Sequence, residues 1–337
     1  MIAEQIKKIV AGNNLTHEEA REVMDEIMSG RASSVQMAAY ISSLSTKGET
    51  VEEVTASAEV MREYGAKLNH DLDVIEIVGT GGDKSNSFNI STTSAFIMAA
   101  AGCKVAKHGN RAASSKSGAA DCLEALGINI DMSIDTAKKM LEEEGFCFLF
   151  APNYHKAMKY VAPVRKELGI RTVFNLLGPL SNPANAKREL MGVYSEDLLE
   201  PMVRVLVNLG VTRCMCVYGV DRLDEISISA STKVCEYKDG KITSYTINPE
   251  DFGFTKADKA EILGGDGKEN AEITLNILKG TERGPKRNVV LLNAGAGIYL
   301  ADRTDSLEEG IKMAADIIDS GLALEKLEKI RKLSLDK

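Results

Sequence analysis

The sequence predicts an α/β protein: a mostly parallel central sheet flanked by helices, joined to a small all-helical domain. Three observations support this class. With 337 residues, the chain exceeds the size at which a single core usually stops growing. Residues 1–65 carry helix signals only. From residue 74 onward, short apolar runs of β-forming residues alternate with helical stretches, as in parallel sheets covered by helices.

The amino-terminal domain is expected to contain several short helices. Threonine followed three residues later by glutamate marks a capping box at two helix starts, and a serine is expected to cap a third. Glycines fall where these helices should end. The residues concerned are Thr16 with Glu19, Thr50 with Glu53, Ser34 before Met37 and Ile41, and Gly30, Gly48 and Gly65.

The first predicted helix carries an apolar stripe that is expected to be exposed. It comprises Ile2, Ile6, Ile9 and Val10. Such a stripe more often packs within one chain, but a bundle this small can also complete its core against a second copy.

Apolar runs farther along the chain are predicted to be strands of the sheet. They are residues 74–78, 103–106, 146–150, 214–218 and 289–292. Residues 238–241, Lys-Asp-Gly-Lys, predict a hairpin turn. Because ligands of such sheets bind at the carboxyl ends of the strands, the site is expected there.

The stretch 164–183 is punctuated by glycine and proline and is predicted to cross back to the helical domain. The small domain is then discontinuous, with residues 1–68 and a returning segment of about residues 165–188. The large domain takes residues 69–164 and 189–337 and is expected to carry the ligand site.

Composition argues against several classes of protein. A net charge of −8 disfavours nucleic acid or an anionic membrane as the default partner. No apolar run approaches the roughly 20 residues of a transmembrane helix, and residues 1–8 lack a signal-peptide pattern, so we expect a soluble cytoplasmic protein. The six cysteines show neither CxxC nor zinc-site spacing, which predicts buried reduced thiols.

A glycine-rich turn follows the first predicted strand, where residues 75–83 read Ile-Glu-Ile-Val-Gly-Thr-Gly-Gly-Asp. The segment Asn89-Ile90-Ser91-Thr92 then opens an alanine-rich helix. Glycines let backbone N–H groups approach a phosphate, and a helix start adds unsatisfied donors. The alternatives are a tight connection and an Asn89 or Ser91 that merely caps the helix. Asp83 is placed to pair with a sugar hydroxyl or amide, or to brace the loop.

A cationic loop follows the second predicted strand and reads Lys107-His108-Gly109-Asn110-Arg111-Ala112-Ala113-Ser114-Ser115. Cations among small residues at a strand end suit a polyanion, although a solvated loop is the alternative. Because Lys107 and Arg111 flank His108, its cationic form should be disfavoured. We therefore expect His108 to act through shape and hydrogen bonding.

An acidic turn, Asp221-Arg222-Leu223-Asp224-Glu225, follows the predicted strand 214–218. Adjacent carboxylates without a nearby histidine suit Mg²⁺, which prefers oxygen ligands and bridges to phosphates. Ser91 is placed to give a hydroxyl to the same ion, and a solvated acidic turn is the alternative.

Together these elements resemble the anthranilate phosphoribosyltransferases, and the resemblance covers essentially the whole chain. It implies a nucleoside-phosphorylase-like fold, Mg²⁺ as cofactor and a homodimer formed through the helical domain. Ala119, Arg222 and Tyr218 depart from the usual serine, glycine and histidine of the family. The motifs that carry the resemblance are residues 79–83, 89–92, 107–111, 174–183 and 223–225.

The resemblance also implies roles for individual residues. The implied phosphoribosyl pyrophosphate contacts are Gly79, Gly82, Asp83, Ser87, Asn89, Ile90, Ser91, Thr92, Lys107, His108, Gly109, Asn110, Arg111, Ala112, Ala113, Ser114, Ser115 and Ala119. The implied Mg²⁺ ligands are Ser91, Asp224 and Glu225. The implied anthranilate contacts are Gly79, Asn110 and Arg165, with Arg165 meeting the carboxylate and His155 near the aromatic entry route.

The implied reaction transfers the phosphoribosyl group from 5-phosphoribosyl 1-pyrophosphate to the amine of anthranilate, in tryptophan biosynthesis. Lys107, Arg111 and Arg165 are the implied catalytic residues. The aromatic amine is neutral at pH 7, so no general base is named. Two alternatives stay open: a pyrimidine nucleoside phosphorylase, which shares the fold and a phosphate loop, and a non-catalytic relative that binds nucleic acid through the basic pocket.

Overall fold

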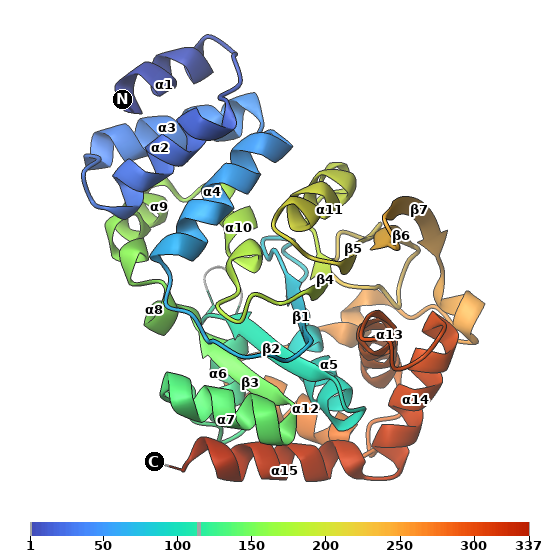
Figure 1. Cartoon of the computed structure of the whole chain (residues 1–337). Helices are drawn as coiled ribbons and strands as arrows, with labels where there is room; N and C mark the ends of the chain where they lie inside the picture. Colours follow the sequence, from blue (N-terminus) through green and yellow to red (C-terminus); the bar gives the residue numbers. More distant parts are fainter. Residues whose placement is uncertain (1, 113–115, 337) are drawn as a thin grey trace.

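A computed structural model describes residues 2–112 and 116–336 of the chain (Figure 1). Its centre is a seven-stranded sheet of order β3-β2-β1-β4-β5-β6-β7. The strands from β3 to β5 pair in parallel, whereas β6 and β7 are antiparallel additions at one edge. The strands are β1 (Val74–Gly79), β2 (Lys104–Gly109), β3 (Phe146–Phe150), β4 (Arg188–Gly192), β5 (Arg213–Gly219), β6 (Thr232–Lys238) and β7 (Lys241–Ile247).

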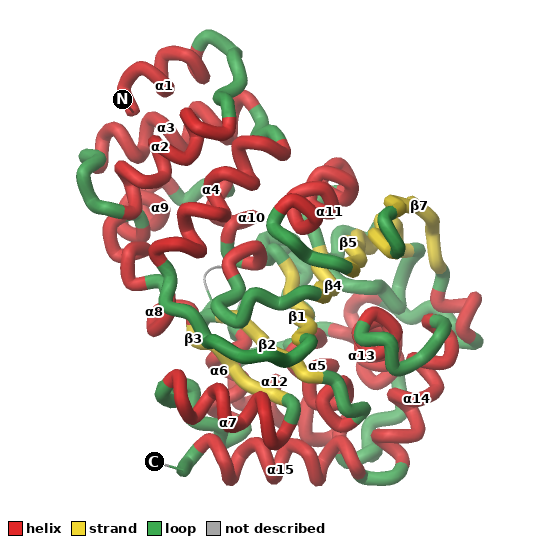
Figure 2. The backbone as a smooth tube through the Cα atoms, viewed as in Figure 1, coloured by secondary structure: helices red, strands yellow, loops and turns green. Residues whose placement is uncertain are grey.

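Helices cover both faces of the sheet and form a separate cluster of α1 to α4 at the upper left of Figure 1. The predicted α/β class with a small helical domain is therefore confirmed. Figure 2 shows helices on both sides of the parallel strands, while β7 lies at an outer edge of the sheet. The helices are α1 (Ile2–Val10), α2 (His17–Met28), α3 (Ser34–Lys47), α4 (Val51–Tyr64), α5 (Ile90–Ala100), α6 (Ala119–Ala125), α7 (Ile134–Glu144), α8 (Ala151–Tyr154), α9 (Ala162–Leu168), α10 (Val173–Leu177), α11 (Leu199–Asn208), α12 (Gly267–Leu278), α13 (Pro285–Leu300), α14 (Leu307–Asp319) and α15 (Leu322–Ser334).

Two predictions about the sheet were wrong. The apolar run 289–292 lies inside α13, whose side chains are buried almost all round, and periodicity alone does not separate a buried helix from a buried strand. The strand β4 was missed because it begins with the charged pair Arg188-Glu189. The hairpin turn between β6 and β7 is confirmed: Asp239 and Gly240 both have positive φ, as a tight two-residue hairpin requires.

The two faces of β5 belong to two different cores. Met215 and Val217 pack into a core with α5 and α13, whereas Cys214 and Cys216 pack with α11 and the helical cluster. The helical domain thus shares one continuous core with a face of the sheet. All six cysteines are buried and free, as predicted. Among the described residues, no helix is both long and apolar enough to cross a membrane.

The helix caps of the amino-terminal cluster mostly follow the prediction. The capping boxes at Thr16 and Thr50 are both formed. The cap of α3 is Ser33, paired with Gln36, and not Ser34: Ser33 has the extended backbone of a cap, while Ser34 is already helical. The predicted exposed stripe is largely buried, with Ile2 and Ile9 inside the bundle and only Val10 70% exposed.

The chain returns to the helical cluster between β3 and β4. A short helix, η1 (Lys156–Tyr160), and α9 contact α2 and α3, and α10 and η2 (Pro179–Ser181) contact α4. The exact division of the chain into two domains stays a prediction.

Glu53 joins three parts of the helical cluster from a fully buried position. Its carboxylate accepts hydrogen bonds from the backbone N–H groups of Leu15 and Thr50, at 2.9 and 2.8 Å, and from Lys47 Nζ at 2.9 Å. The Lys47 side chain is only 8% exposed. Loss of the carboxylate would leave two N–H groups without their acceptor and the Lys47 ammonium with only neutral partners, Asn14 Oδ1 and the Gly48 carbonyl.

We therefore expect Glu53→Ala to lower the free energy of unfolding by about 3–5 kcal/mol, as for other broken buried ion pairs. Urea unfolding followed by circular dichroism would measure it. Glu52→Ala, in the same helical turn but exposed, should change the value by no more than about 0.5 kcal/mol. Equal losses in the two variants would contradict the role given to Glu53.

Candidate active site

A cleft of about 660 Å³ opens at the carboxyl ends of β1, β2 and β5. It gathers the glycine-rich turn, the start of α5, the cationic loop and the acidic turn. All the described residues predicted to hold phosphoribosyl pyrophosphate or Mg²⁺ line it, whereas Ala113, Ser114 and Ser115 lie outside the described residues. The lining residues from those predictions are Gly79, Gly82, Asp83, Ser87, Asn89, Ile90, Ser91, Thr92, Lys107, His108, Gly109, Asn110, Arg111, Ala112, Ala119, Asp224 and Glu225.

The glycine-rich turn has backbone conformations with positive φ, which glycine adopts most easily. Gly81 and Gly82 have φ of 69° and 76°. Lys84 and Asn86 also have positive φ, which marks this turn as locally strained. Asp83 braces the turn, because its Oδ1 accepts the Ser85 N–H at 3.0 Å. Bracing of the loop by Asp83 is thus confirmed, and its pairing with a ligand stays a prediction.

The start of α5 faces the cleft without a side-chain cap. Asn89 occupies the cap position, but its Oδ1 instead accepts hydrogen bonds from Ser117 Oγ at 3.2 Å and Asn270 Nδ2 at 2.8 Å. The alternative that Asn89 merely caps the helix is therefore wrong. The first-turn N–H groups of α5 have no side-chain acceptor from their own cap residue, which suits an anion at this position.

Lys107 is almost completely buried at the end of β2. Its Nζ donates to the carbonyl of Ile77 at 2.8 Å and to Ser91 Oγ at 3.1 Å. Burial lowers its pKa, while the carboxylates of Glu76 and Glu225 act in the opposite direction. A buried ammonium next to the glycine-rich turn can form strong charge-assisted hydrogen bonds to an anion.

His108 is neutral in this environment, as predicted. Burial is the main cause and lowers its pKa to about 3, with smaller effects from His155 and Lys107. The rings of His108 and His155 lie 5.0 Å apart in an edge-to-face arrangement. The backbone N–H of His108 donates to Glu76 Oε1 at 2.8 Å, which fixes this part of the loop.

Arg111 is held by carboxylates on α6. Its guanidinium pairs with Glu124 and with Asp121, and it lies over the Phe150 ring at 5.7 Å. Asp121 also accepts the N–H groups of Ala112 and Gly118, at 3.0 and 2.8 Å. The Asp121 carboxylate thus holds Ala112 of the cationic loop next to Gly118, which precedes α6.

The acidic turn brings the carboxylates of Asp224 and Glu225 close to that of Asp83, beyond the carboxyl end of β1. Burial raises the pKa of Asp224 well above its ordinary value, helped by the charges of Asp83 and Glu225. Burial likewise raises the pKa of Glu225 to about 7, while Lys107 and Ser91 lower it. Asp224 Oδ2 accepts the N–H of Gly81 at 2.7 Å. Buried carboxylates that repel one another suit a bound cation.

Two glycines make room for this turn, and sequence reasoning missed one of them. Gly79 and Gly192 are register neighbours on β1 and β4, and a Cβ on either would overlap Asp224. At Gly192 the obstacle is the Asp224 backbone, which cannot rotate away. Gly192 lies in the strand that the sequence did not reveal, so no local signal pointed to it.

Two of the predicted anthranilate residues do not line this cleft. Arg165 lies on α9, where its guanidinium stands 5.3 Å from the centre of the Phe174 ring and burial lowers its pKa. His155 borders a different cleft, on the far side of His108. Asn175, from α10, does line the active-site cleft and was not among the predicted residues.

Comparison with known proteins gives a consistent result. The family described as "Glycosyl transferase family, a/b domain" matches residues 71–324, and "Glycosyl transferase family, helical bundle domain" matches residues 3–65. The anthranilate phosphoribosyltransferase of Methanobrevibacter smithii is 57% identical, and the alignment covers 98% of each chain. That of Lachnoclostridium phytofermentans is 55% identical over 99% of each chain.

Solved structures agree with these sequence matches. The anthranilate phosphoribosyltransferase from Thermus thermophilus superposes with a TM-score of 0.93 at 44% identity, covering 98% of this chain and 99% of that one. The Saccharomyces cerevisiae enzyme in complex with PRPP and Mg superposes with a TM-score of 0.91 at 27% identity, covering 99% of this chain and 97% of that one.

The packing at Gly192 leads to a direct test. Gly192→Ala should push the acidic turn out of place, lower the free energy of unfolding by about 1–3 kcal/mol, and weaken binding of Mg²⁺–pyrophosphate in calorimetric titrations. Gly284→Ala is the matched control, because its added Cβ meets only the flexible end of Glu282, at 3.0 Å, and Gly284 does not line the cleft. Unchanged pyrophosphate affinity in Gly192→Ala would refute this account of the turn.

Proposed function

The chain belongs to the anthranilate phosphoribosyltransferases, and we propose that its active-site cleft binds the phosphoribosyl donor through the residues assembled there. The enzyme transfers the phosphoribosyl group of 5-phosphoribosyl 1-pyrophosphate to the amine of anthranilate, giving N-(5-phosphoribosyl)anthranilate and pyrophosphate in tryptophan biosynthesis. The single observation that most supports the proposed donor site is the meeting of the glycine-rich turn, Lys107 and the acidic turn in one cleft.

Mg²⁺ fits the acidic turn on the chemistry of its donors. Asp224 and Glu225 are each only 9% exposed, and their pKa values are raised by burial and by neighbouring carboxylates. Ser91 hydrogen-bonds Glu225 and so belongs to the same group. We propose Ser91, Asp224 and Glu225 as the residues that hold Mg²⁺. When bound there, the ion supplies positive charge to the pyrophosphate oxygens.

The chain's own residues would contribute positioning and charge. Lys107, from its buried position, and Arg111, after leaving Glu124, would bind the departing pyrophosphate. The N–H groups of the glycine-rich turn and of α5 would hold the remaining phosphate oxygens. Such a preorganised set of donors stabilises the charge that develops on the leaving group as the ribose approaches an oxocarbenium ion.

The attacking amine needs little help from the protein. An aromatic amine is neutral at pH 7, and attack from the face opposite the pyrophosphate inverts C1 of the ribose. The C1–O bond breaks as the C1–N bond forms, and the proton of the amine can pass to the ortho carboxylate of anthranilate. Holding the two substrates in line is therefore the larger part of the task.

We propose that anthranilate binds between Gly79 and Asn110, with its carboxylate paired to Arg165 and with His155 near its entry route. Gly79 and Asn110 line the cleft, while Arg165 approaches from α9. The lowered pKa of Arg165 reports a partly desolvated guanidinium. Such a group gains more from a carboxylate partner than an exposed one does.

We propose a small domain of residues 1–68 with a returning segment of about 165–188, and a large domain of 69–164 and 189–337. The contacts of η1 and α9 with α2 and α3 favour a returning segment that begins earlier, near residue 156. We also propose that the enzyme is cytoplasmic and does not act on nucleic acid or membranes.

A homodimer through the helical domain is our proposal for the assembly. Val10 on α1 and Val35 on α3 are 70% and 79% exposed, and these two helices lie against each other. Exposed large apolar side chains on two neighbouring helices of a small bundle suit burial against a second copy.

The first test is the reaction itself. With phosphoribosyl pyrophosphate, Mg²⁺ and anthranilate, the fluorescence of anthranilate should fall, and pyrimidine nucleosides with phosphate should remain uncleaved. Nucleoside cleavage would favour the phosphorylase alternative, and retention on DNA at low salt would favour the nucleic-acid alternative.

Glu225→Gln should shift the Mg²⁺ titration of activity to higher concentration, while the exposed control Glu272→Gln should not.

Arg165→Ala should raise the KM for anthranilate by about 10- to 100-fold, the cost of losing one charge-assisted hydrogen-bonding group. The KM for phosphoribosyl pyrophosphate should change little, because Arg165 does not line the donor cleft. Lys166→Ala, the exposed neighbour on α9, is the control. An unchanged KM for anthranilate would reject the carboxylate role of Arg165.

Val35→Asp should convert the dimer into monomers that keep their helical content, because a buried unpaired charge at an interface is costly. Light scattering after size-exclusion chromatography would measure the mass. Leu322→Asp, on α15 and 47% exposed, should leave the mass unchanged. A wild-type protein that is already monomeric would contradict the proposed assembly.

A further inference from the structure

A second cleft, of about 640 Å³, follows the two segments that connect the helical domain to the sheet. We name it the linker groove. It is lined by residues 62, 65–72, 138, 155, 181–185 and 187, and it shares none of them with the active-site cleft. Of its lining residues, only His155 has a proposed part in the transfer reaction, near the entry route of anthranilate.

The linker groove is cationic in a chain that is acidic overall. Arg62, Lys67, Lys138 and Lys187 line it from four different parts of the chain, against a single acidic residue, Asp71. The whole chain has 41 basic and 49 acidic residues, so this balance departs from the average. A focused positive charge of this kind attracts anions.

Of the three lysines of the groove, only Lys138 forms an ion pair in the described part of the chain, and that pair is long. Lys187 Nζ reaches only the carbonyl of Gly210, at 3.3 Å. The paired oxygen of Lys138, Glu142 Oε1, is 3.9 Å away, and Lys67 is exposed with no ion pair among the described residues. Their ammonium groups are therefore available to an incoming anion.

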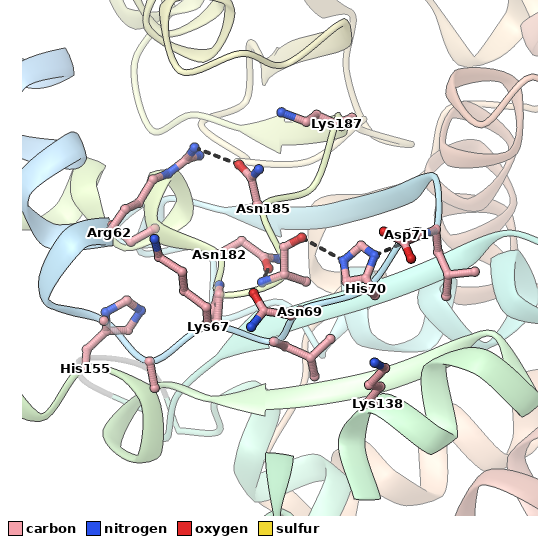
Figure 3. A pocket seen from close by; sticks show the side chains of 17 residues that line it. Arg62, Lys67, Asn69, His70, Asp71, Lys138, His155, Asn182, Asn185 and Lys187 are labelled. Atoms are coloured by element: carbon pink, nitrogen blue, oxygen red, sulfur yellow. Dashed lines mark hydrogen bonds between the residues drawn. The ribbon is translucent and has the colours of Figure 1, made fainter. Parts of the chain in front are cut away.

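Arg62 is held in place by neutral groups. It donates to the carbonyls of Leu180 and Leu209, at 2.7 and 3.2 Å, and to Asn185 Oδ1 at 3.3 Å. These direct partners are carbonyl and amide groups, while the carboxylates of Glu189, Glu76 and Glu59 act on the guanidinium charge without hydrogen-bonding it. Figure 3 shows Arg62, Lys67, Asn185 and Lys187 around one side of the groove, with Lys138 on the other.

We propose that the linker groove binds a small anion that carries phosphate or carboxylate groups. Ammonium and guanidinium donors, with the amides of Asn69 and Asn185, match the acceptor oxygens of such a ligand. The volume lies in the range of small-molecule sites.

The floor of the groove is bonded to the active site. Asn182 Nδ2 donates to Glu76 and to the carbonyl of Ala106, the latter at 2.8 Å. Glu76 in turn accepts the N–H of His108, a residue of the active-site cleft. His155, a wall of the groove, packs against His108. An anion here would therefore act on the part of the cleft next to the proposed anthranilate site.

An anion in the groove would also restrain the linkers. The two segments are joined by hydrogen bonds from Leu68 N–H to the carbonyl of Pro183, at 3.0 Å, and between His70 Nε2 and the carbonyl of Ala184, at 2.8 Å. Arg62 belongs to α4 of the helical domain and Lys138 to α7 beside the sheet. A ligand that bridges them favours one relative position of the two parts, and its effect is limited to its differential affinity for that position.

The test measures anion binding directly. Equilibrium dialysis of the full-length protein with inorganic phosphate, and separately with citrate, would be run with and without saturating Mg²⁺ and phosphoribosyl pyrophosphate. We expect one phosphate- or citrate-binding site per protomer to persist when the donor substrate fills the active site. Binding of phosphate alone identifies a phosphate-bearing ligand, and binding of citrate alone identifies a carboxylate-bearing one.

The persistent site should weaken about tenfold or more when Lys67, Lys138 and Lys187 are all replaced by alanine. The control replaces Lys139, Lys268 and Lys279 by alanine, which removes the same charge from exposed positions outside the groove. Lys67→Glu alone, at an exposed position, gives a second test should the triple variant fold poorly. Hydrogen exchange of residues 65–72 and 181–187 should slow when phosphate is added to the wild type.

Absence of binding to the substrate-saturated protein would overturn the proposal. Equal weakening in the two triple variants would overturn it too, because the effect would then come from net charge and not from the groove. Neither outcome bears on the transfer reaction, which the fluorescence assay tests separately.

Discussion

The close approach of the acidic turn to two strand ends is the constraint on which the active-site cleft depends. Gly79 and Gly192 lie side by side on β1 and β4, and Asp224 fills the space that their side chains would occupy. This contact places Asp224 Oδ2 on the N–H of Gly81 and so joins the acidic turn to the glycine-rich turn. Without it, the anion-binding and cation-binding parts of the cleft would lie on separate loops with no fixed distance between them.

Charge balance is the second requirement of the cleft. Lys107 is buried between the carboxylates of Glu76 and Glu225, and each of the three groups has a pKa displaced by its loss of water. A single buried ammonium does not neutralise Asp83, Asp224 and Glu225 together. These carboxylates therefore favour a bound cation, and with Lys107 already in place only Arg111 has to change its partner to meet a polyanion.

The sequence predicted those parts of the site whose signal is local. The glycines of residues 79–83, the cations of residues 107–111 and the pair Asp224-Glu225 each follow a recognisable strand, and the structure brings all of them together. It did not predict Gly192, because the need for glycine arises only from a distant segment of the chain, at Asp224. Residues 289–292 were wrongly predicted to be a strand, because a helix that is buried all round lacks the helical periodicity of apolar residues.

The place of Arg165 relative to the cleft could not be predicted for a related reason: packing alone sets the position of α9, and no residue of α9 lines the cleft. That packing also limits how far the helical domain can travel. Its core continues through α11 to Cys214 and Cys216 on the sheet, so a wide opening would expose buried apolar surface. A small sliding of packed helices costs much less. Asn175 of the neighbouring α10 already lines the cleft, so a movement of this limited kind is the one that the packing allows for the proposed approach of Arg165 to an anthranilate carboxylate.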